Sequence, residues 1–423
     1  MQRNPTLSRI RLFLAWLLAS VISSICPQLV RAQNTGCPIF PTDSVWNTPV
    51  DTLPVHPSSD TYVTAIGKTI GLHPDFGTVY QGTPNGIPFT IVPSTQPFVP
   101  VVYTAYGNES DPGPFPIPPN ALIEGGANST GDRHVLVIQT GICKLYELFN
   151  AHPVSGGSWT ADSGAVWNLH SHALRLDSWT SADAAGLPIF PGLVRYDEVQ
   201  AGAITHALRF TVPKTQSAHL WPARHHTAPT GAQYPPMGLR FRLKASYDIS
   251  SFSPKNQVIL RAMKKYGMFV SDNGSAWYIS GAPDTRWDDD DLHALGRVTG
   301  ANFEAVDESG LRIIADSGQA RQGTGTPACT QIPDPPVLLT PPAEAVVTVG
   351  PVLLDWADVS CATSYRVLIR RGPRRKATVY QRDRLLISQD VIPLLARGTY
   401  YWSVSVCNNY GCSSSMSRPF TVQ

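Results

Sequence analysis

The stretch GTGTPACTQIPDPPVLLTPP, residues 323–342, decides how this chain is organised. Glycine, threonine and proline dominate it, and proline lacks the backbone donor that a helix interior or a central strand requires. Beyond this stretch the sequence alternates apolar and polar residues in short runs separated by turns, which predicts a small antiparallel β-sandwich. These runs lie at 352–356, 364–369, 385–387 and 400–406.

A chain of 423 residues is long enough for two folded units, and its 42% hydrophobic content is ample for buried cores. We therefore expect a Gly/Thr/Pro-rich linker at 321–334, a β-rich catalytic unit at 33–320, and the small sandwich at 335–423. The net charge of +2 gives no basic excess of the kind that nucleic-acid binding requires.

Two segments of the last unit resemble strand regions of fibronectin type III-like domains. They are LLDWADVSCATSYRVLI at 353–369 and GTYYWSVSVCNNYGCSSSMSRPF at 398–420. The resemblance implies an Ig/fibronectin type III-like β-sandwich that serves as a spacer, an adhesive module or a module that holds an enzyme near its substrate. The cysteines depart from that pattern. The resemblance places six side chains in the core, namely Trp356, Tyr365, Val367, Tyr400, Trp402 and Val404.

The larger unit is expected to be mainly β, an antiparallel sandwich of the jelly-roll type or a barrel with a few helices. Val, Thr, Tyr and Trp are frequent, and 38 prolines and 33 glycines favour strands joined by turns. One helix is predicted after Ser253, a suitable N-cap, with Pro254 in its first turn and Gly267 at its end.

Segments of this unit also resemble a family of exported bacterial proteins, a resemblance that implies an intact domain and no particular activity. The segments are SVWNTPVDTLPVHP (44–57), SDPGPFPIP (110–118), SADAAGLPIFPGLVRYDEV (181–199), HALRFT (206–211) and RWDDDDL (286–292).

The first 32 residues have the composition of a signal peptide. Arg3, Arg9 and Arg11 precede an apolar run at 12–25, and Val30-Arg31-Ala32 forms an A-x-A-like cleavage site. The apolar run is too short for a comfortable membrane span. We expect a secreted, extracellular chain without a membrane span, and a monomer.

Cleavage would leave six cysteines, and an even number in an exported chain indicates disulfides. Fifteen pairings are possible. Their division between the two units suggests a bridge between Cys37 and Cys143 and two bridges within the remaining set. That set is Cys329, Cys361, Cys407 and Cys412.

Six of the eleven histidines lie between residues 167 and 226. If the chain around His170 and His172 is extended, both imidazoles share one face and can bind a transition metal, with a third ligand from His206, His225 or Asp197. The alternative is a pair of hydrogen-bonded histidines without a metal.

The same block contains the groups that glycosidic bond cleavage requires. A hydrolase uses two carboxyl groups, and a lyase uses a base with a cation that neutralises a uronate. We expect the catalytic residues among Asp197, Glu198, His206 and Arg209. The competing interpretation is a buried carboxylate paired with an arginine beside a solvated neighbour.

Substrate contacts are expected from residues that suit a sugar-binding surface, where an indole stacks on the sugar and polar groups bind hydroxyls. The expected contacts are Asp183, Trp221, Arg224, His225 and Trp287. A buried tryptophan is an equally good reading of Trp221. Asp288 and Asp290 belong to a run of four aspartates that suits calcium, the one cofactor suggested, or simply a solvated turn.

These features favour a secreted carbohydrate-active enzyme, a glycoside hydrolase or polysaccharide lyase that acts on an extracellular polysaccharide. The first alternative is a non-catalytic glycan- or surface-binding protein. The second is a metal-dependent oxidative or hydrolytic enzyme. A convergence of the expected catalytic side chains in one site would distinguish the first reading from the other two.

Overall fold

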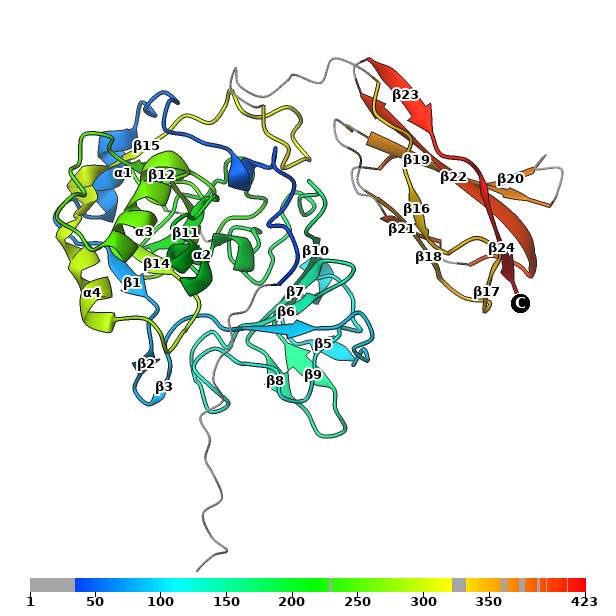
Figure 1. Cartoon of the computed structure of the whole chain (residues 1–423), viewed down its shortest axis with the longest axis horizontal. Helices are drawn as coiled ribbons and strands as arrows, with labels where there is room; N and C mark the ends of the chain where they lie inside the picture. The colour runs from blue at the N-terminus through cyan, green and yellow to red at the C-terminus, as the bar shows by residue number, and fades with distance from the viewer. Residues whose placement is uncertain are drawn as a thin grey trace, which may run out of the picture. The chain divides into compact units, whose positions relative to one another are not determined.

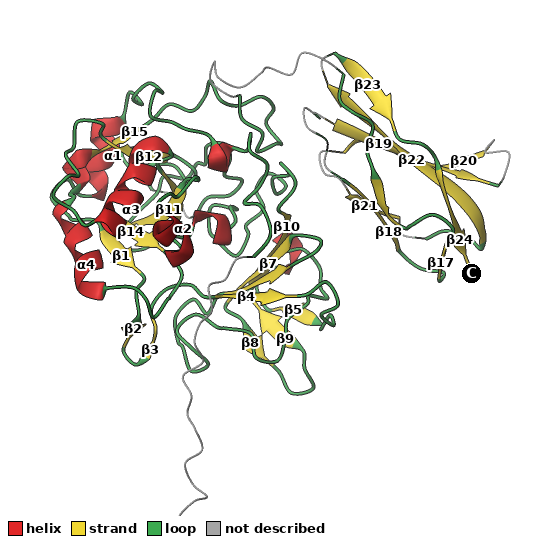
Figure 2. Cartoon of the chain, in the orientation of Figure 1, coloured by secondary structure: helices red, strands yellow, loops and turns green. Residues whose placement is uncertain are grey.

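The computed structural model describes residues 35–227, 230–321, 332–357, 359, 362, 364–372, 377–385, 389–392, 394–408 and 410–423. The expected signal peptide at 1–32 lies outside the described residues, as does most of the expected linker. Strands make up 34% and helices 13% of the structure, so the expected mainly β class is confirmed (Figure 2).

One six-stranded sheet of the N-terminal unit has the order β1-β14-β11-β13-β12-β15 (Figure 1). The pairs β1–β14 and β11–β13 are parallel, and the others are antiparallel. The expected antiparallel arrangement did not include these parallel pairs, which need long crossover connections that no local turn signal reveals. The strands are β1 (His73–Asp75), β11 (Leu208–Val212), β12 (Arg240–Leu243), β13 (Met268–Asn273), β14 (Tyr278–Ser280) and β15 (Phe303–Ala305).

A four-stranded sheet, β10-β7-β6-β4, shares the larger hydrophobic core of this unit with the six-stranded sheet. Beside it are a three-stranded sheet, β5-β9-β8, and the hairpin β2–β3. The strands are β2 (Val79–Tyr80), β3 (Thr83–Pro84), β4 (Phe89–Val92), β5 (Val101–Tyr103), β6 (Val135–Gln139), β7 (Lys144–Phe149), β8 (His152–Pro153), β9 (Trp159–Ala161) and β10 (Ser163–Asn168).

Short helices complete the unit, and α1 to α4 lie around the six-stranded sheet in Figure 2. They are α1 (Ser59–Ile66), α2 (Tyr196–Ala201), α3 (Pro254–Lys265) and α4 (Asp289–His293). The 3-10 helices are η1 (Val45–Asn47), η2 (Gly107–Glu109), η3 (Phe190–Gly192), η4 (Ala294–Arg297) and η5 (Gly300–Asn302).

The predicted helix after Ser253 is confirmed as α3. The Ser253 hydroxyl accepts the backbone N–H of Asn256, which is the expected N-cap bond. Gly267 has φ +67°, a left-handed conformation that ends the helix at low steric strain. Val258, Ile259 and Met263 are buried, so the apolar stripe of the helix faces the core.

An aromatic cluster fills one face of the six-stranded sheet. Phe210 stacks on Trp277 at 5.6 Å between ring centroids, and Trp277 stacks on Phe303 at 5.0 Å. Phe241 meets Trp277 edge-on. Burying a phenylalanine contributes roughly 1.5–3 kcal/mol. This apolar face fixes the sheet and turns the alternate side chains of β11 and β14 to the opposite face.

The C-terminal unit is a β-sandwich of two sheets, β16-β18-β21 and β17-β24-β22-β19-β20, with β23 paired to β22. All six expected core side chains are buried, and β22 alternates buried and less buried residues along its length. The strands are β16 (Leu338–Thr340), β17 (Ala345–Val347), β18 (Val352–Trp356), β19 (Ser364–Arg371), β20 (Ala377–Leu385), β21 (Gln389–Ile392), β22 (Gly398–Asn408), β23 (Gly411–Ser414) and β24 (Arg418–Val422).

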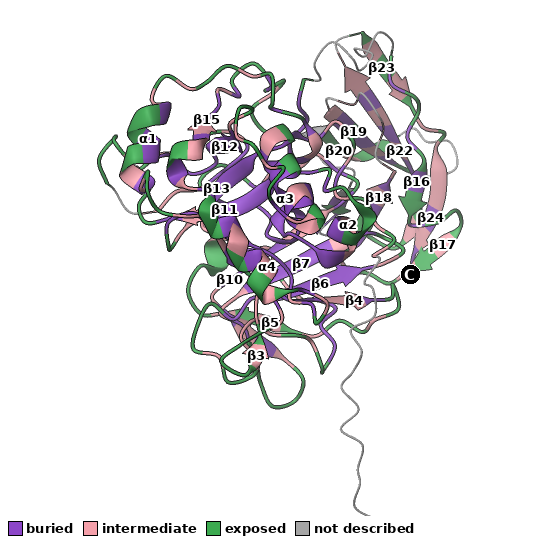
Figure 3. Cartoon of the chain, turned by 60° about the vertical axis from the view of Figure 1, so that its left-hand side comes forward, coloured by how far each residue is buried: buried purple, intermediate pink, exposed green. Residues whose placement is uncertain are grey.

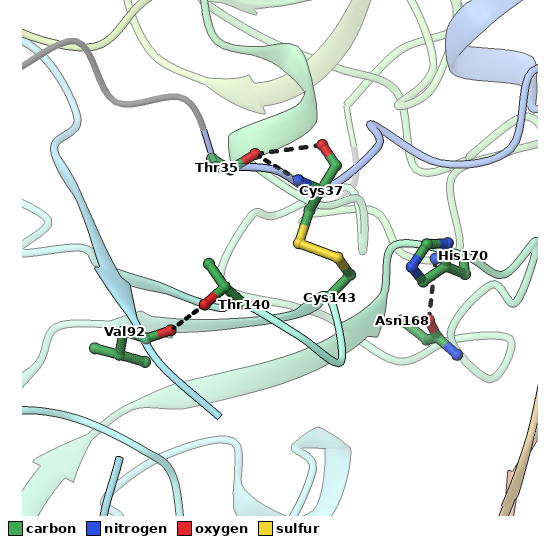
Figure 4. Close-up of a disulfide and its surroundings, with 7 residues drawn as sticks. All are labelled: Thr35, Cys37, Val92, Thr140, Cys143, Asn168 and His170. Carbon is green, nitrogen blue, oxygen red and sulfur yellow. Dashed lines mark hydrogen bonds between the residues drawn. A yellow bond between two sulfur atoms is a disulfide. The ribbon is translucent and has the colours of Figure 1, made fainter. Parts of the chain in front are cut away.

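Two disulfides lie within the described residues. The expected bridge between Cys37 and Cys143 is confirmed and ties the first described residues to the end of the β6–β7 hairpin (Figure 4). The second joins Cys407 to Cys412 across β22 and β23. Cys329 and Cys361 fall outside the described residues. No helix in the described ranges has the length and apolar character needed to cross a membrane.

Replacing Cys37 and Cys143 together by serine should lower the free energy of unfolding of the N-terminal unit by about 4–5 kcal/mol. The bridge spans a sequence separation of 106, and long loops gain the most from closure. Urea unfolding followed by tryptophan fluorescence measures the change. The matched double variant C407S/C412S opens a separation of only 5 and should have a smaller effect. A loss below 1 kcal/mol for the first pair contradicts the prediction.

Candidate functional site

The polar face of the six-stranded sheet carries a row of functional side chains. Asp75 on β1 lies opposite Ser280 on β14, and Phe210 on β11 lies opposite Ile279. Alternate residues of a strand point to opposite faces, so Asp75, Ser280 and Arg209 share the face away from the aromatic cluster. A hydrogen bond from Arg209 to the Ser280 hydroxyl agrees with this register. The sheet therefore brings an exposed carboxyl, a hydroxyl and a buried guanidinium into one row.

Arg209 forms a buried, bidentate ion pair with Asp183. Its Nε and Nη2 atoms donate to the two carboxylate oxygens over 3.1 and 2.8 Å. Both side chains are almost fully buried; in Figure 3 the strand β11 that carries Arg209 is coloured as buried. Gly192 permits this packing, because a Cβ there would lie 2.9 Å from the Cβ of Arg209. Asp183, an expected substrate contact, lies in this site with both oxygens held by Arg209.

A second charge pair, Glu124 with His134, lies beside Arg209. The His134 Nδ1 is 2.6 Å from the Glu124 Oε2, and its Nε2 is 3.0 Å from the carbonyl oxygen of Ala182. Burial opposes the charge on both groups, but their mutual attraction outweighs it. The pKa of His134 is raised to about 9 and the pKa of Glu124 is lowered. Arg209 adds to the lowering at Glu124.

The pKa of Asp272 is shifted upward, in contrast to that of Glu124. It lies near the end of β13, is partly exposed, and accepts the backbone N–H of Asn273 at 2.7 Å. Burial raises its pKa to about 7, and the negative charge of Asp183 adds to this, against the attraction of Arg209. Near neutral pH a substantial fraction of Asp272 therefore carries a proton.

Asp75 is the most accessible carboxyl of the group. The protein around its carboxyl removes water and raises its pKa, and the charge of Glu124 acts in the same direction. Attraction to His73 and Arg209 partly offsets this effect. The site thus combines one buried arginine with carboxyl groups of different protonation, an arrangement able to donate and accept protons at neighbouring positions.

Four residues of this site, Asp75, Glu124, His134 and Asp272, lie outside the histidine-rich block and were not expected from the sequence. A local signal was present, because each of the three carboxyl residues is followed within two residues by a glycine. The sequences are DFG at 75–77, EGG at 124–126 and DNG at 272–274. Only the folded structure shows that all three carboxyl groups come under the electrostatic influence of Arg209.

The expected catalytic residues divide between separate sets of contacts. Glu198 accepts a hydrogen bond from Arg195 and lies 3.2 Å from His206 Nε2. The positive charges of Arg195 and His206 overcome burial and lower the pKa of Glu198 to about 2. Asp197 instead pairs with Arg286 at 2.8 Å. Among the four expected residues, only Arg209 belongs to the site described above.

The two expected tryptophans lie in different surroundings. Trp287 is buried, donates to the carbonyl oxygen of Ala282 and packs edge-on against Phe76 and Tyr196. It is therefore a core residue and presents no exposed ring face. Trp221 is half-buried and donates to the carbonyl oxygen of Ser317.

Arg224 and His225 are also held by local partners. Arg224 pairs with Asp316 at 2.7 Å, and the Nδ1 of His225 is 2.7 Å from the carbonyl oxygen of Ala184. The Ala184 contact places His225 one residue from Asp183, whereas Arg224 is directed to the 315–316 segment.

The expected metal ligands do not form a ligand set. His172 pairs with Asp43 at 2.9 Å, and His170 is exposed. Asp288 caps α4 by accepting the N–H of Asp291, and Asp290 is exposed. Within the described ranges, no three His, Cys, Asp or Glu side chains converge in a way that could hold a metal ion. The aspartate run reads as a helix start, where carboxylates are favoured by the unpaired N–H groups.

Comparisons with known proteins yield likenesses to solved structures. No protein-family model matches the sequence, and no curated protein matches it. The chain is similar to the crystal structure of FN3tt at 15% identity, covering 22% of this chain and 98% of that one, with a TM-score of 0.18. The fn3 domain of human collagen alpha-1(XX) shows 22% identity, 23% and 89% coverage, and a TM-score of 0.17.

The fn3 domain of human contactin 1 shows 16% identity, 25% and 93% coverage, and a TM-score of 0.18. The neighbours are fibronectin type III domains, consistent with the sandwich at the C-terminus. At such TM-scores the assignment rests on the strand order and core of that unit itself. Nothing in these similarities bears on the Arg209 site.

Replacing Asp183 by asparagine should lower the free energy of unfolding by about 3–5 kcal/mol, because a neutral amide leaves the Arg209 charge buried without its partner. Equilibrium urea unfolding at pH 7 measures the effect. Asp177→Asn is the control, since Asp177 is 65% exposed and lies 3.7 Å from Arg224; an exposed pair contributes less than about 1 kcal/mol. Equal losses in the two variants would refute the prediction.

Proposed function

We propose that this chain is a secreted glycoside hydrolase that cleaves an extracellular polysaccharide, with Asp272 as the general acid and Glu124 as the base or nucleophile. The observation that supports this most directly is that two partly exposed carboxyl groups, both under the electrostatic influence of the buried Arg209, have pKa values shifted in opposite directions. The environment raises the pKa of Asp272 to about 7 and lowers the pKa of Glu124. Glycosidases require one protonated and one ionised carboxyl at the same pH.

In the proposed reaction the Asp272 carboxyl gives its proton to the glycosidic oxygen as the bond to the anomeric carbon breaks. The Glu124 carboxylate either removes a proton from the attacking water, which inverts the configuration, or attacks the anomeric carbon itself, which retains it. In the second case water then hydrolyses the glycosyl–enzyme bond, with Asp272 acting as the base. Asp75, exposed on the same face, is suited to bind sugar hydroxyls.

The arrangement of Arg209 favours a hydrolase over a lyase. A polysaccharide lyase needs a cation that binds and neutralises the uronate carboxylate. Arg209 instead directs its Nε and both terminal nitrogens to Asp183 and Ser280. Its positive charge acts on Glu124 and Asp272, and each of its three nitrogens already donates to a protein oxygen.

The residues expected first have a supporting place in this proposal. Glu198, His206 and Arg195 form a largely buried network, and Arg195 also donates to the carbonyl oxygens of Phe190 and Leu193. This network holds η3, whose Gly192 lies against Arg209. Glu198 and His206 therefore help to hold in place the η3 segment that packs against Arg209.

Export, a monomeric state and binding to a polysaccharide belong to the same proposal. The expected signal peptide and the disulfides suit an oxidising extracellular compartment. The fibronectin type III-like unit suits a module that holds the enzyme near its substrate. The alternative is a non-catalytic glycan-binding protein, which would bind a polysaccharide and release no reducing ends from it.

Reducing-end release from a panel of neutral and acidic polysaccharides tests the proposal through its pH dependence. Activity should be highest on the acidic side of about pH 7. It should fall as pH rises through the Asp272 pKa of about 7, because the acid loses its proton, and fall at low pH as Glu124 becomes protonated.

The variants D272N and E124Q should each lower kcat by roughly 100- to 10,000-fold, since each removes one proton-transfer group. Asp60→Asn, on the exposed side of α1, serves as the matched control and should retain wild-type activity. Binding without release at any pH, or full activity in D272N, would overturn the hydrolase proposal.

A further inference from the structure

The imidazole of His134 is buried, and each of its two ring nitrogens lies within hydrogen-bond distance of an oxygen. Its side chain is 3% exposed, its ring packs near Phe149, and both ring nitrogens have an oxygen partner. The partner at Nε2 is the Ala182 carbonyl oxygen, which can only accept a hydrogen bond. The Nε2 atom therefore carries a proton, and the state of Nδ1 decides the charge of the ring.

The Nδ1 atom faces Glu124 Oε2 at 2.6 Å, so a single proton lies between them. The backbone N–H of His134 also donates to Oε2, at 3.3 Å. An oxygen that already accepts a backbone N–H is poorly placed to be the hydroxyl of a carboxylic acid that donates to Nδ1. The geometry thus favours a carboxylate at Glu124 and a doubly protonated ring at His134.

These contacts also fix where the Glu124 carboxylate points. The Glu124 backbone N–H donates to the His134 carbonyl oxygen at 3.0 Å, which adds a third contact between the two residues. All side-chain bonds of Glu124 within the described residues use Oε2. The Glu124 side chain is 24% exposed, so Oε1 is the oxygen left to meet a substrate or a water molecule.

His134 further connects Glu124 to the centre of the site. Ala182, its second partner, precedes Asp183, which binds Arg209. Ser181 secures this turn by donating to the Leu187 carbonyl oxygen at 2.6 Å. The imidazole of His134 therefore links Glu124 to the segment that binds Arg209.

We propose that His134 is a positioning residue, a permanently protonated imidazolium that holds Glu124 ionised and directs its Oε1 into the site. This inference rests on the proposed role of Glu124 in hydrolysis. His134 does not touch the substrate and transfers no proton during the reaction. The charged groups that act on it are Glu124, Asp132, Arg209, Asp183 and Asp272.

Nitrogen NMR of the histidine rings in the full chain tests the charge state without any assay of activity. Both nitrogens of His134 should remain protonated at pH 8, where an ordinary histidine is neutral. In E124Q the pKa of His134 should fall below about 6.5, because burial then disfavours the charged ring without a carboxylate at Nδ1 to stabilise it. Deprotonation of wild-type His134 below pH 7 overturns the proposal.

The second measurement is the titration of Glu124 by carbon NMR in wild type and H134N. Loss of the adjacent cation should raise the Glu124 pKa by about 1 unit or more. His152→Asn is the matched control, because His152 is exposed and bonds only to Asn150 among the described residues. If H134N is unfolded, H134Q replaces it. An unchanged Glu124 titration in a folded His134 variant overturns the positioning role.

Kinetics then separate this role from simple structural support. In H134N the acid limb of the kcat/KM profile should move upward by the same amount as the Glu124 titration, with kcat at least tenfold lower and KM within about twofold. A lower rate with an unshifted profile contradicts the inference. If no glycan is cleaved even by wild type, the hydrolase proposal fails, while the NMR results still decide the state of the His134–Glu124 pair.

Discussion

The buried ion pair between Arg209 and Asp183 is the constraint on which the N-terminal unit depends. It fastens β11, a central strand of the six-stranded sheet, to the turn at 181–187. A guanidinium without a partner in this position would be strongly destabilising, so strand and turn must keep their relative placement. Gly192 completes the arrangement, since any larger residue would displace Arg209. Burial of the aromatic cluster on the opposite face offsets the free-energy cost of burying these charged groups.

The same arginine gives the neighbouring carboxyl groups their different chemistry. Arg209 forms its ion pair with Asp183, and its positive charge also acts to lower the pKa values of Glu124 and Asp272. Glu124 gains a second cation from His134, and its pKa falls. At Asp272 burial and the negative charge of Asp183 outweigh the attraction of Arg209 and His134, and the pKa rises to about 7. Burial and neighbouring charges thus give two ordinary carboxyl residues different pKa values. Such a difference suits one of them to act as an acid and the other as a base.

The sequence predicted what short-range physics controls. The capping signals at Ser253 and Gly267 gave α3, and period-2 alternation gave the core of the C-terminal sandwich around Trp356 and Trp402. The site was beyond such reasoning, because Glu124 lies in a loop and Asp272 near the end of β13, and both come under the influence of Arg209 only through contacts between segments far apart in the chain. The histidine-rich block was misleading for the same reason. His219, His225 and His226 stack on one another, but His206 lies inside a salt-bridge network and His170 is exposed to solvent.

The buried carboxyl groups also link stability and activity through pH. Glu147 accepts the Trp167 indole N–H and the backbone N–H groups of Ile189 and Phe190, yet complete burial raises its pKa to about 7. A carboxyl whose folded pKa lies above its unfolded value binds its proton more tightly in the native state, so its ionisation opposes folding as pH rises from about 4.5 to 7. Asp272 behaves in the same way. The mildly acidic range that keeps Asp272 protonated for proton donation is therefore also the range in which these interior groups oppose the native state least.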